Sequence, residues 1–83
     1  MAAPSLRKFS DLVKRDLMYT MKNVSEKQII EYLDLPSVRI FIEKEYDNHI
    51  QRYEKGKVGD KGFKVGCISA TSYNLYMLYP DIP

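Results

Sequence analysis

The chain has few side chains that could act as nucleophiles or metal ligands. His49 is the only histidine and Cys67 the only cysteine among its 83 residues. A structural zinc site takes four ligands, so these two side chains cannot build one. His49 also has no serine or cysteine at the spacing of a catalytic motif. We therefore predict a protein that is not an enzyme, needs no metal or cofactor and takes no small-molecule substrate.

A glycine-rich loop carries side chains that could bind phosphate. Gly56, Gly59 and Gly62 recur every three residues, with lysines between them. Such loops can direct backbone N–H groups at phosphates, as in KH domains. The loop does not match the P-loop pattern Gly-x-x-x-x-Gly-Lys-Ser/Thr. The alternative is a hairpin loop in which glycine serves the turn and the lysines are solvated.

Charge is distributed unevenly along the chain. Residues 1–22 and 52–64 are each net basic, whereas residues 23–51 are net acidic, and the whole chain carries +2. A helix over residues 25–33, a turn at 34–36 and a helix from residue 38 have the outline of a helix–turn–helix. With a preceding helix and a following glycine-rich hairpin, this order of elements resembles that of small phage and bacterial winged-helix DNA-binding domains.

The resemblance implies a nucleic-acid-binding regulator, which we take as the alternative function. Its contacts would run to phosphates, through basic side chains of the first helix and the loop: Arg7, Lys8, Lys14, Arg15, Lys57, Lys61 and Lys64. The helix that would enter the groove carries Glu43, Glu45 and Asp47, more acidic than basic residues, which opposes binding to DNA. A plain pair of helices packed through their apolar faces is the competing interpretation.

The segment near the C-terminus has more apolar side chains than one face can hold. Tyr73, Leu75, Met77 and Tyr79 alternate as in a strand, while Tyr73, Tyr76 and Tyr79 repeat as on a helix. Either period leaves apolar groups on two faces, and an exposed apolar patch usually marks a contact site. We therefore expect a protein-interaction or assembly subunit that binds a partner, or a second copy of itself, through Tyr73, Tyr76, Met77 and Tyr79. The size would suit a viral accessory protein or a minor subunit of a larger complex.

Three helices must position these groups. Apolar residues at steps of three and four predict a helix from Leu6 to about Met21 and another over residues 38–54. Between them, Ser25 and Gln28 form a capping box that starts a helix, which must end near Asp34 because of Pro36. Ser37 is the expected cap of the third helix.

We predict a strand over residues 63–70, because Phe63, Val65 and Cys67 alternate with Lys64, Gly66 and Ile68. Residues 73–79 are expected to form a second strand that pairs with it. The fold class predicted is α+β: a three-helix part, a Gly-rich loop and a C-terminal β-hairpin. We expect a single domain over residues 1–83, with extended tails at 1–4 and 80–83. No segment is apolar enough to span a membrane, and the lone cysteine favours a reducing location, cytoplasmic or nuclear. The expected core is Phe9, Leu12, Val13, Leu17, Ile29, Ile30, Leu33, Val38, Phe41, Ile42, Ile50, Val65 and Leu75.

Overall fold

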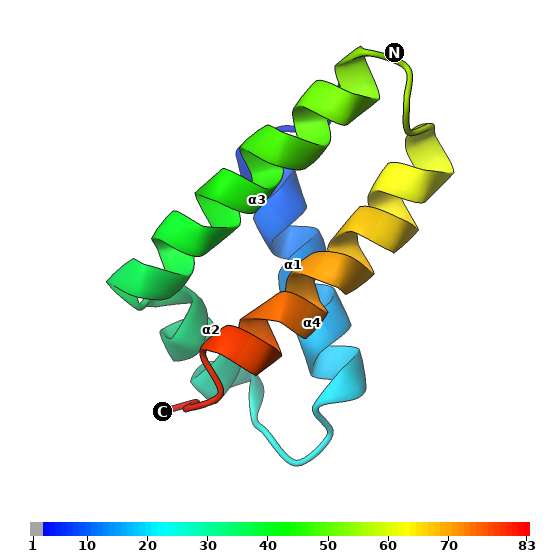
Figure 1. Ribbon diagram of the computed structural model, residues 1–83. Coiled ribbons are helices and arrows are strands. Elements are labelled where there is room, and N and C mark those ends of the chain that lie inside the picture. Colours follow the sequence, from blue (N-terminus) through cyan, green and yellow to red (C-terminus); the bar gives the residue numbers. More distant parts are fainter. Residues whose placement is uncertain (1–2) are drawn as a thin grey trace.

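The computed structural model describes residues 3–83, and every regular element in that range is helical (Figure 1). In chain order the elements are α1 (Leu6–Thr20), α2 (Glu26–Asp34), α3 (Pro36–Glu54), η1 (Gly62–Cys67) and α4 (Ile68–Leu78). The π-helical segment η1 continues directly into α4. The predicted α+β class with a C-terminal β-hairpin is therefore wrong, since residues 3–83 contain no strand.

The first two helices begin where their capping residues predict. The Ser5 hydroxyl accepts a hydrogen bond from the Lys8 N–H at 3.1 Å, which satisfies one free donor of α1. The predicted capping box of α2 is confirmed, because Ser25 and Gln28 each bind the other's backbone N–H.

The third helix starts differently from the prediction. Leu35 is the only residue between α2 and α3, and Pro36 occupies the first turn of α3, so the expected cap by Ser37 is wrong. Proline suits that position because its fixed φ is helical and no N–H is needed there. At its other end α3 ends before Gly56, which adopts φ +75°. The Lys57 N–H binds the Arg52 carbonyl at 2.9 Å, as in a Schellman motif.

The residues expected to form strands are helical because their buried positions follow a helical period. The side chains of η1 and α4 that face the core are Phe63, Cys67, Ile68, Thr71, Ser72 and Leu75. Two of these, Thr71 and Ser72, are polar, so a search for the spacing of apolar residues does not reveal that they are buried. Thr71 is buried at little cost because its hydroxyl donates to the Cys67 carbonyl at 2.8 Å. Val65, predicted as core, is 58% exposed.

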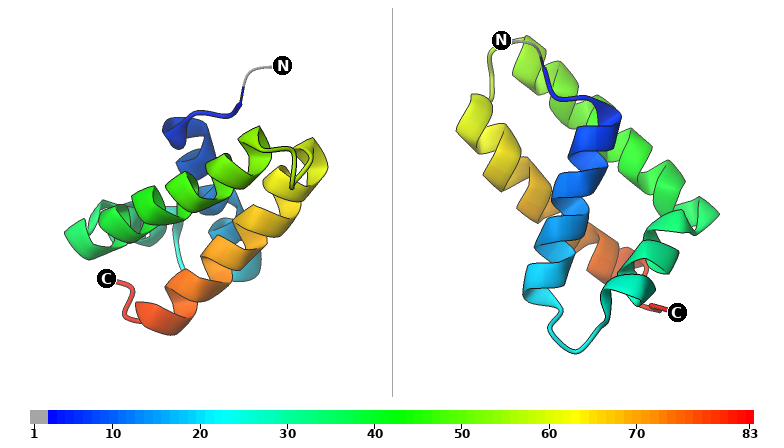
Figure 2. Two further views of the ribbon diagram at one scale, coloured as in Figure 1. Left: turned by 45° about the horizontal axis from the view of Figure 1, so that its top comes forward. Right: turned by 180° about the vertical axis from the view of Figure 1, so that it is seen from behind.

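The helices pack around one core. Seen from behind, α1 lies across α3 and the η1–α4 helix, and α2 lies beside the N-terminal end of α3 (Figure 2). Aromatic rings join the elements, with Phe9 of α1 5.8 Å from Phe63 of η1 and 5.5 Å from Tyr46 of α3. Ile30, also predicted as core, is 44% exposed, and Tyr32 takes the buried place on α2 instead.

Both chain ends lack regular structure where they are described. After α4 the chain turns back, so that Ile82 packs against the core and the Pro83 carbonyl accepts from Gln28 Nε2 at 3.1 Å. Of the expected N-terminal tail, Met1 and Ala2 lie outside the described residues. None of the helices within residues 3–83 has the length and hydropathy needed to cross a membrane.

Candidate functional site

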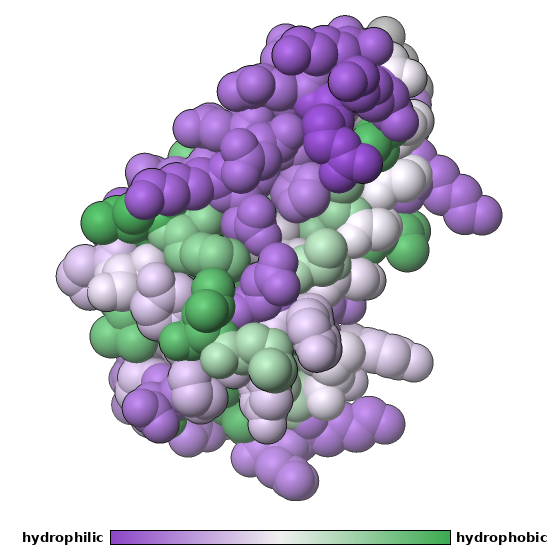
Figure 3. Space-filling model, in the orientation of Figure 1, coloured by the Kyte–Doolittle hydropathy of each residue, from purple (hydrophilic) through white to green (hydrophobic). Residues whose placement is uncertain are grey.

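The C-terminal half of α4 presents a cluster of large apolar side chains to solvent. We call this cluster the α4 surface: Tyr73, Tyr76, Met77 and Leu78, each more than half exposed. The space-filling view shows polar residues covering the upper end of the molecule, while apolar residues gather in its lower half, over α4 and the start of α3 (Figure 3). Three of the four side chains predicted to bind a partner therefore lie together and are accessible.

Tyr79, the fourth predicted residue, is placed differently. Its ring lies 5.8 Å from the ring of Phe41 in an edge-on arrangement, and it packs against the core. Its carbonyl accepts a hydrogen bond from the Tyr32 hydroxyl at 2.6 Å. Tyr79 closes the end of α4 and helps to hold that helix on α2 and α3.

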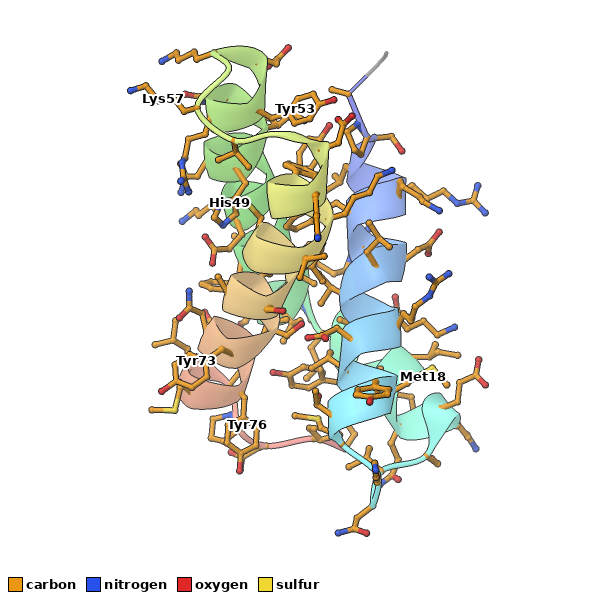
Figure 4. The ribbon with its side chains drawn as sticks, turned by 90° about the vertical axis from the view of Figure 1, so that its right-hand side faces the viewer. Met18, His49, Tyr53, Lys57, Tyr73 and Tyr76 are labelled. Atoms are coloured by element: carbon orange, nitrogen blue, oxygen red, sulfur yellow. The ribbon has the colours of Figure 1, made fainter. Side chains whose placement is uncertain are left out.

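A groove lies beside the α4 surface, between the C-terminal part of α1 and α4. Its volume is about 730 Å³, and its walls are mainly apolar. The residues lining it include Leu17, Met21 and Val24 on one side, Tyr73 and Tyr76 on the other, and Pro80 and Ile82 at the end. Tyr73 and Tyr76 both project outward from the last turns of α4 (Figure 4). Ser72, also in the wall, is buried, and its hydroxyl has no hydrogen-bond partner within the described part of the chain.

Two apolar residues of this region were missing from the sequence prediction. Tyr19 is 76% exposed and lies with Val65 along a smaller hollow between α1 and η1. Tyr19 falls outside the apolar stripe of α1. Its position, a large apolar residue on the polar face of a helix, was the feature of the sequence from which its exposure could have been predicted. Val65 could not be recognised, because the strand interpretation placed it inside.

The basic residues predicted to bind nucleic acid are only partly brought together. Arg7 and Lys8 are exposed at the start of α1, which packs against η1 and the end of α3. Lys57 lies at this same end, far from Tyr73 and Tyr76 (Figure 4). The remaining predicted side chains divide as follows: Lys61 and Lys64 are exposed at the start of the η1–α4 helix, Arg15 is exposed midway along α1, and Lys14 pairs with Glu26 at 3.2 Å.

A polar cluster on the seam between α3 and α4 also escaped the prediction. Asn74 Nδ2 donates to Glu45 Oε1 at 3.1 Å, and His49 Nε2 lies 3.8 Å from Glu45 Oε2. Burial lowers the pKa of His49, an effect that Glu45 opposes and Arg52 reinforces. The side chains of His49 and Glu45 are only 13% and 14% exposed, so this polar cluster lies within the packed seam. The cluster fixes α4 against α3 and so positions the α4 surface.

Cys67, the one cysteine of the chain, is a buried free thiol. Burial raises the pKa of the Cys67 thiol, with a further increase from Glu45 and a decrease from Arg52, so the thiol stays protonated at neutral pH. No group of three or more potential ligand side chains gathers within the described range. Comparison of the chain with protein-family models, curated proteins and solved structures found no match.

Proposed function

We propose that this protein is a non-enzymatic interaction subunit that binds another protein through the α4 surface. The observation that carries the proposal is the exposure of Tyr73, Tyr76, Met77 and Leu78 within two turns of one helix, at 64%, 55%, 59% and 61%. Single exposed apolar residues are normal on a protein, but a contiguous patch of them usually marks a contact site.

The chemical character of these residues supports the same proposal. Tyrosine and methionine are enriched where proteins meet, because they offer a large apolar area, and tyrosine adds a hydroxyl that can stay hydrated or find a partner. The α4 surface has no charged residue of its own. Charged groups are depleted at the centre of interfaces, because removing a charge from water is costly.

The test replaces exposed apolar groups without touching the core. We expect a Tyr76→Ser, Met77→Ser double variant to keep the far-UV circular dichroism of the wild type, because both side chains are more than half exposed. It should lose association measured by sedimentation and by quantitative pull-down from the cells that express the protein, by about tenfold or more. Tyr79 is unsuitable for this test, because its replacement would disturb the packing against Phe41.

The matched control is Ile30→Ser. Ile30 is 44% exposed on α2 and lines a different hollow, with Leu6 and Lys14 of α1, so the variant removes an exposed apolar group away from the α4 surface. Association that survives the double variant, or that Ile30→Ser reduces equally, contradicts the proposal.

The nucleic-acid alternative has less support. The glycine-rich hairpin that would form the wing is a loop followed by η1, Lys14 is already paired with Glu26, and α2 and α3 are joined by a single residue. The cytoplasmic or nuclear location remains part of the proposal, because Cys67 is buried as a free thiol and packs as a small core residue.

A further inference from the structure

The groove beside the α4 surface is longer than its main hollow. The hollow of about 730 Å³ and the smaller one of about 280 Å³ share Asp16 and Ser69 in their walls, so they are neighbours along α1 and the η1–α4 helix, and we refer to the two together as the groove. On the η1–α4 side it extends from Lys64 to Tyr76. At a rise of 1.5 Å per residue this is about 18 Å, the length of roughly three helical turns.

We propose that this groove binds an amphipathic helix of a partner protein, whose apolar face is flanked by acidic residues. This inference rests on the proposed function and names the class of partner. The three arguments concern backbone hydrogen bonding, the apolar floor and the charges of the rim.

Backbone hydrogen bonding favours a helix over an extended segment. An extended peptide gains affinity by adding to a sheet edge, and residues 3–83 have no strand to offer one. Its N–H and C=O groups would lose water in the groove without gaining partners, which is costly. A helix satisfies its own backbone groups and presents only side chains.

The groove floor fits the spacing of apolar side chains on such a helix. Both hollows carry apolar residues: Leu12, Val65 and Ile68 line the smaller one, and Leu17, Met21, Tyr76 and Ile82 line the main one. A bound helix inserts side chains at positions i, i+3 or i+4, and i+7, which span about two turns. The length and the apolar floor therefore match one face of a short helix.

The charges of the rim select the flanks of that helix. Arg15, Lys22 and Lys64 line the two hollows, against a single acidic residue, Asp16. None of the three basic side chains has an ion-pair partner among residues 3–83. They are free to pair with acidic side chains beside the apolar stripe of a partner, and they repel a basic helix.

The test is a selection from a displayed library of amphipathic helices of about 15 residues, each about 22 Å long. The positions that flank the apolar stripe are randomised between Glu and Lys. We expect enrichment of Glu at the flanks. An enriched peptide, synthesised and labelled, should bind the Tyr76→Ser variant about tenfold more weakly by fluorescence anisotropy.

Charge reversal tests the rim directly. An Arg15→Glu, Lys22→Glu double variant should bind the Glu-flanked peptide about fivefold more weakly and should favour the Lys-flanked one. A Lys44→Glu, Lys55→Glu double variant makes the same change in net charge outside the groove and should bind as the wild type does. Enrichment of Lys at the flanks, or no preference, overturns the inference.

The remaining outcomes separate this inference from the proposed function. If no helix is enriched while Tyr76→Ser, Met77→Ser still abolishes association, the partner class is wrong and the interaction function stands. If sedimentation shows self-association that Tyr76→Ser abolishes, a second copy occupies the groove instead. If neither helices nor any protein bind the α4 surface, both proposals fall.

Discussion

At the scale of single residues, Tyr32 is the side chain that ties α2 to the end of α4. It is fully buried, and its hydroxyl lies 3.1 Å from the Leu75 carbonyl and 2.6 Å from the Tyr79 carbonyl. Burial, with a smaller contribution from Tyr79, raises the pKa of Tyr32 to about 12. The Leu75 carbonyl also accepts from the Tyr79 N–H at 2.8 Å, so the Tyr32 hydroxyl adds a second hydrogen bond there, and it satisfies the Tyr79 carbonyl just beyond the end of α4.

Replacing Tyr32 by phenylalanine keeps the ring and removes that hydrogen bond. We expect Tyr32→Phe to lower the free energy of unfolding by about 1–3 kcal/mol, because the Tyr79 carbonyl loses its hydrogen bond from Tyr32 and the Leu75 carbonyl keeps only the one from the Tyr79 N–H. Urea denaturation measures the change. Tyr19→Phe is the control, since Tyr19 is 76% exposed and its removal should leave the stability unchanged. Equal stability of Tyr32→Phe and the wild type would contradict the capping role.

His49 makes stability depend on pH. Its pKa is lowered from 6.5, chiefly by burial, with Glu45 raising it and Arg52 lowering it. From α4, the uncharged Asn74 donates to Glu45, the carboxylate beside His49. From η1, the protonated thiol of Cys67 lines the same hollow as His49. The folded protein therefore favours the neutral imidazole, and the stabilisation is complete above the unfolded pKa. It is lost as the pH falls below 6.5.

We expect the wild type to lose more stability than His49→Gln between about pH 6.5 and about pH 5, a window above the titration of ordinary carboxylates. Thermal melts across this range measure the difference, and an NMR titration of the imidazole gives the pKa itself. A measured pKa of His49 at or above 6.5 would show that Glu45 outweighs burial.

At the scale of the elements, the glycines of residues 56–66 serve two different purposes. Gly56 has φ +75°, a conformation that other residues adopt at a cost, and it ends α3. Gly66 lies in a helical segment, and a methyl group placed on it would meet no atom within 4 Å. The sequence pattern predicted one loop over Gly56, Gly59 and Gly62, whereas Gly62 lies in η1 and the positive φ belongs to Gly56.

This difference predicts opposite effects of the same substitution. Gly56→Ala should destabilise the protein by about 1–2 kcal/mol, because the left-handed conformation crowds a Cβ atom. Gly66→Ala should stabilise it by about 0.5–1 kcal/mol, because alanine loses less conformational freedom in a helix. Chemical denaturation of the two variants checks both signs, and a destabilising Gly66→Ala would argue against a helical η1.

At the scale of the whole molecule, the two ends differ in character. The start of α1, the end of α3 and the start of η1 meet at a polar end that carries several basic side chains, including Lys57 (Figure 4). The α4 surface lies toward the other end, on a body measuring 37 × 22 × 20 Å. An interaction through the α4 surface leaves the polar end hydrated, which suits a small subunit that docks by one face.

The sequence by itself determined the first three helices, within a few residues. Their apolar stripes have a helical period, and local signals at Ser25 and Gly56 mark where two of the boundaries fall. It also identified Tyr73, Tyr76 and Met77 as surplus apolar groups, since an excess of such residues can be counted without a structure.

Only the tertiary structure decided the form of the last third and the place of Tyr79. Residues 63–78 satisfy both periods locally, and the choice depends on burying Phe63, Cys67 and Leu75 against α1 and α3 while Thr71 bonds its own helix. Tyr79 was expected outside, but Tyr32 and Phe41, more than thirty residues away, hold it against the core. Such contacts between distant segments leave no local trace in the sequence, so they become visible only when the helices have packed.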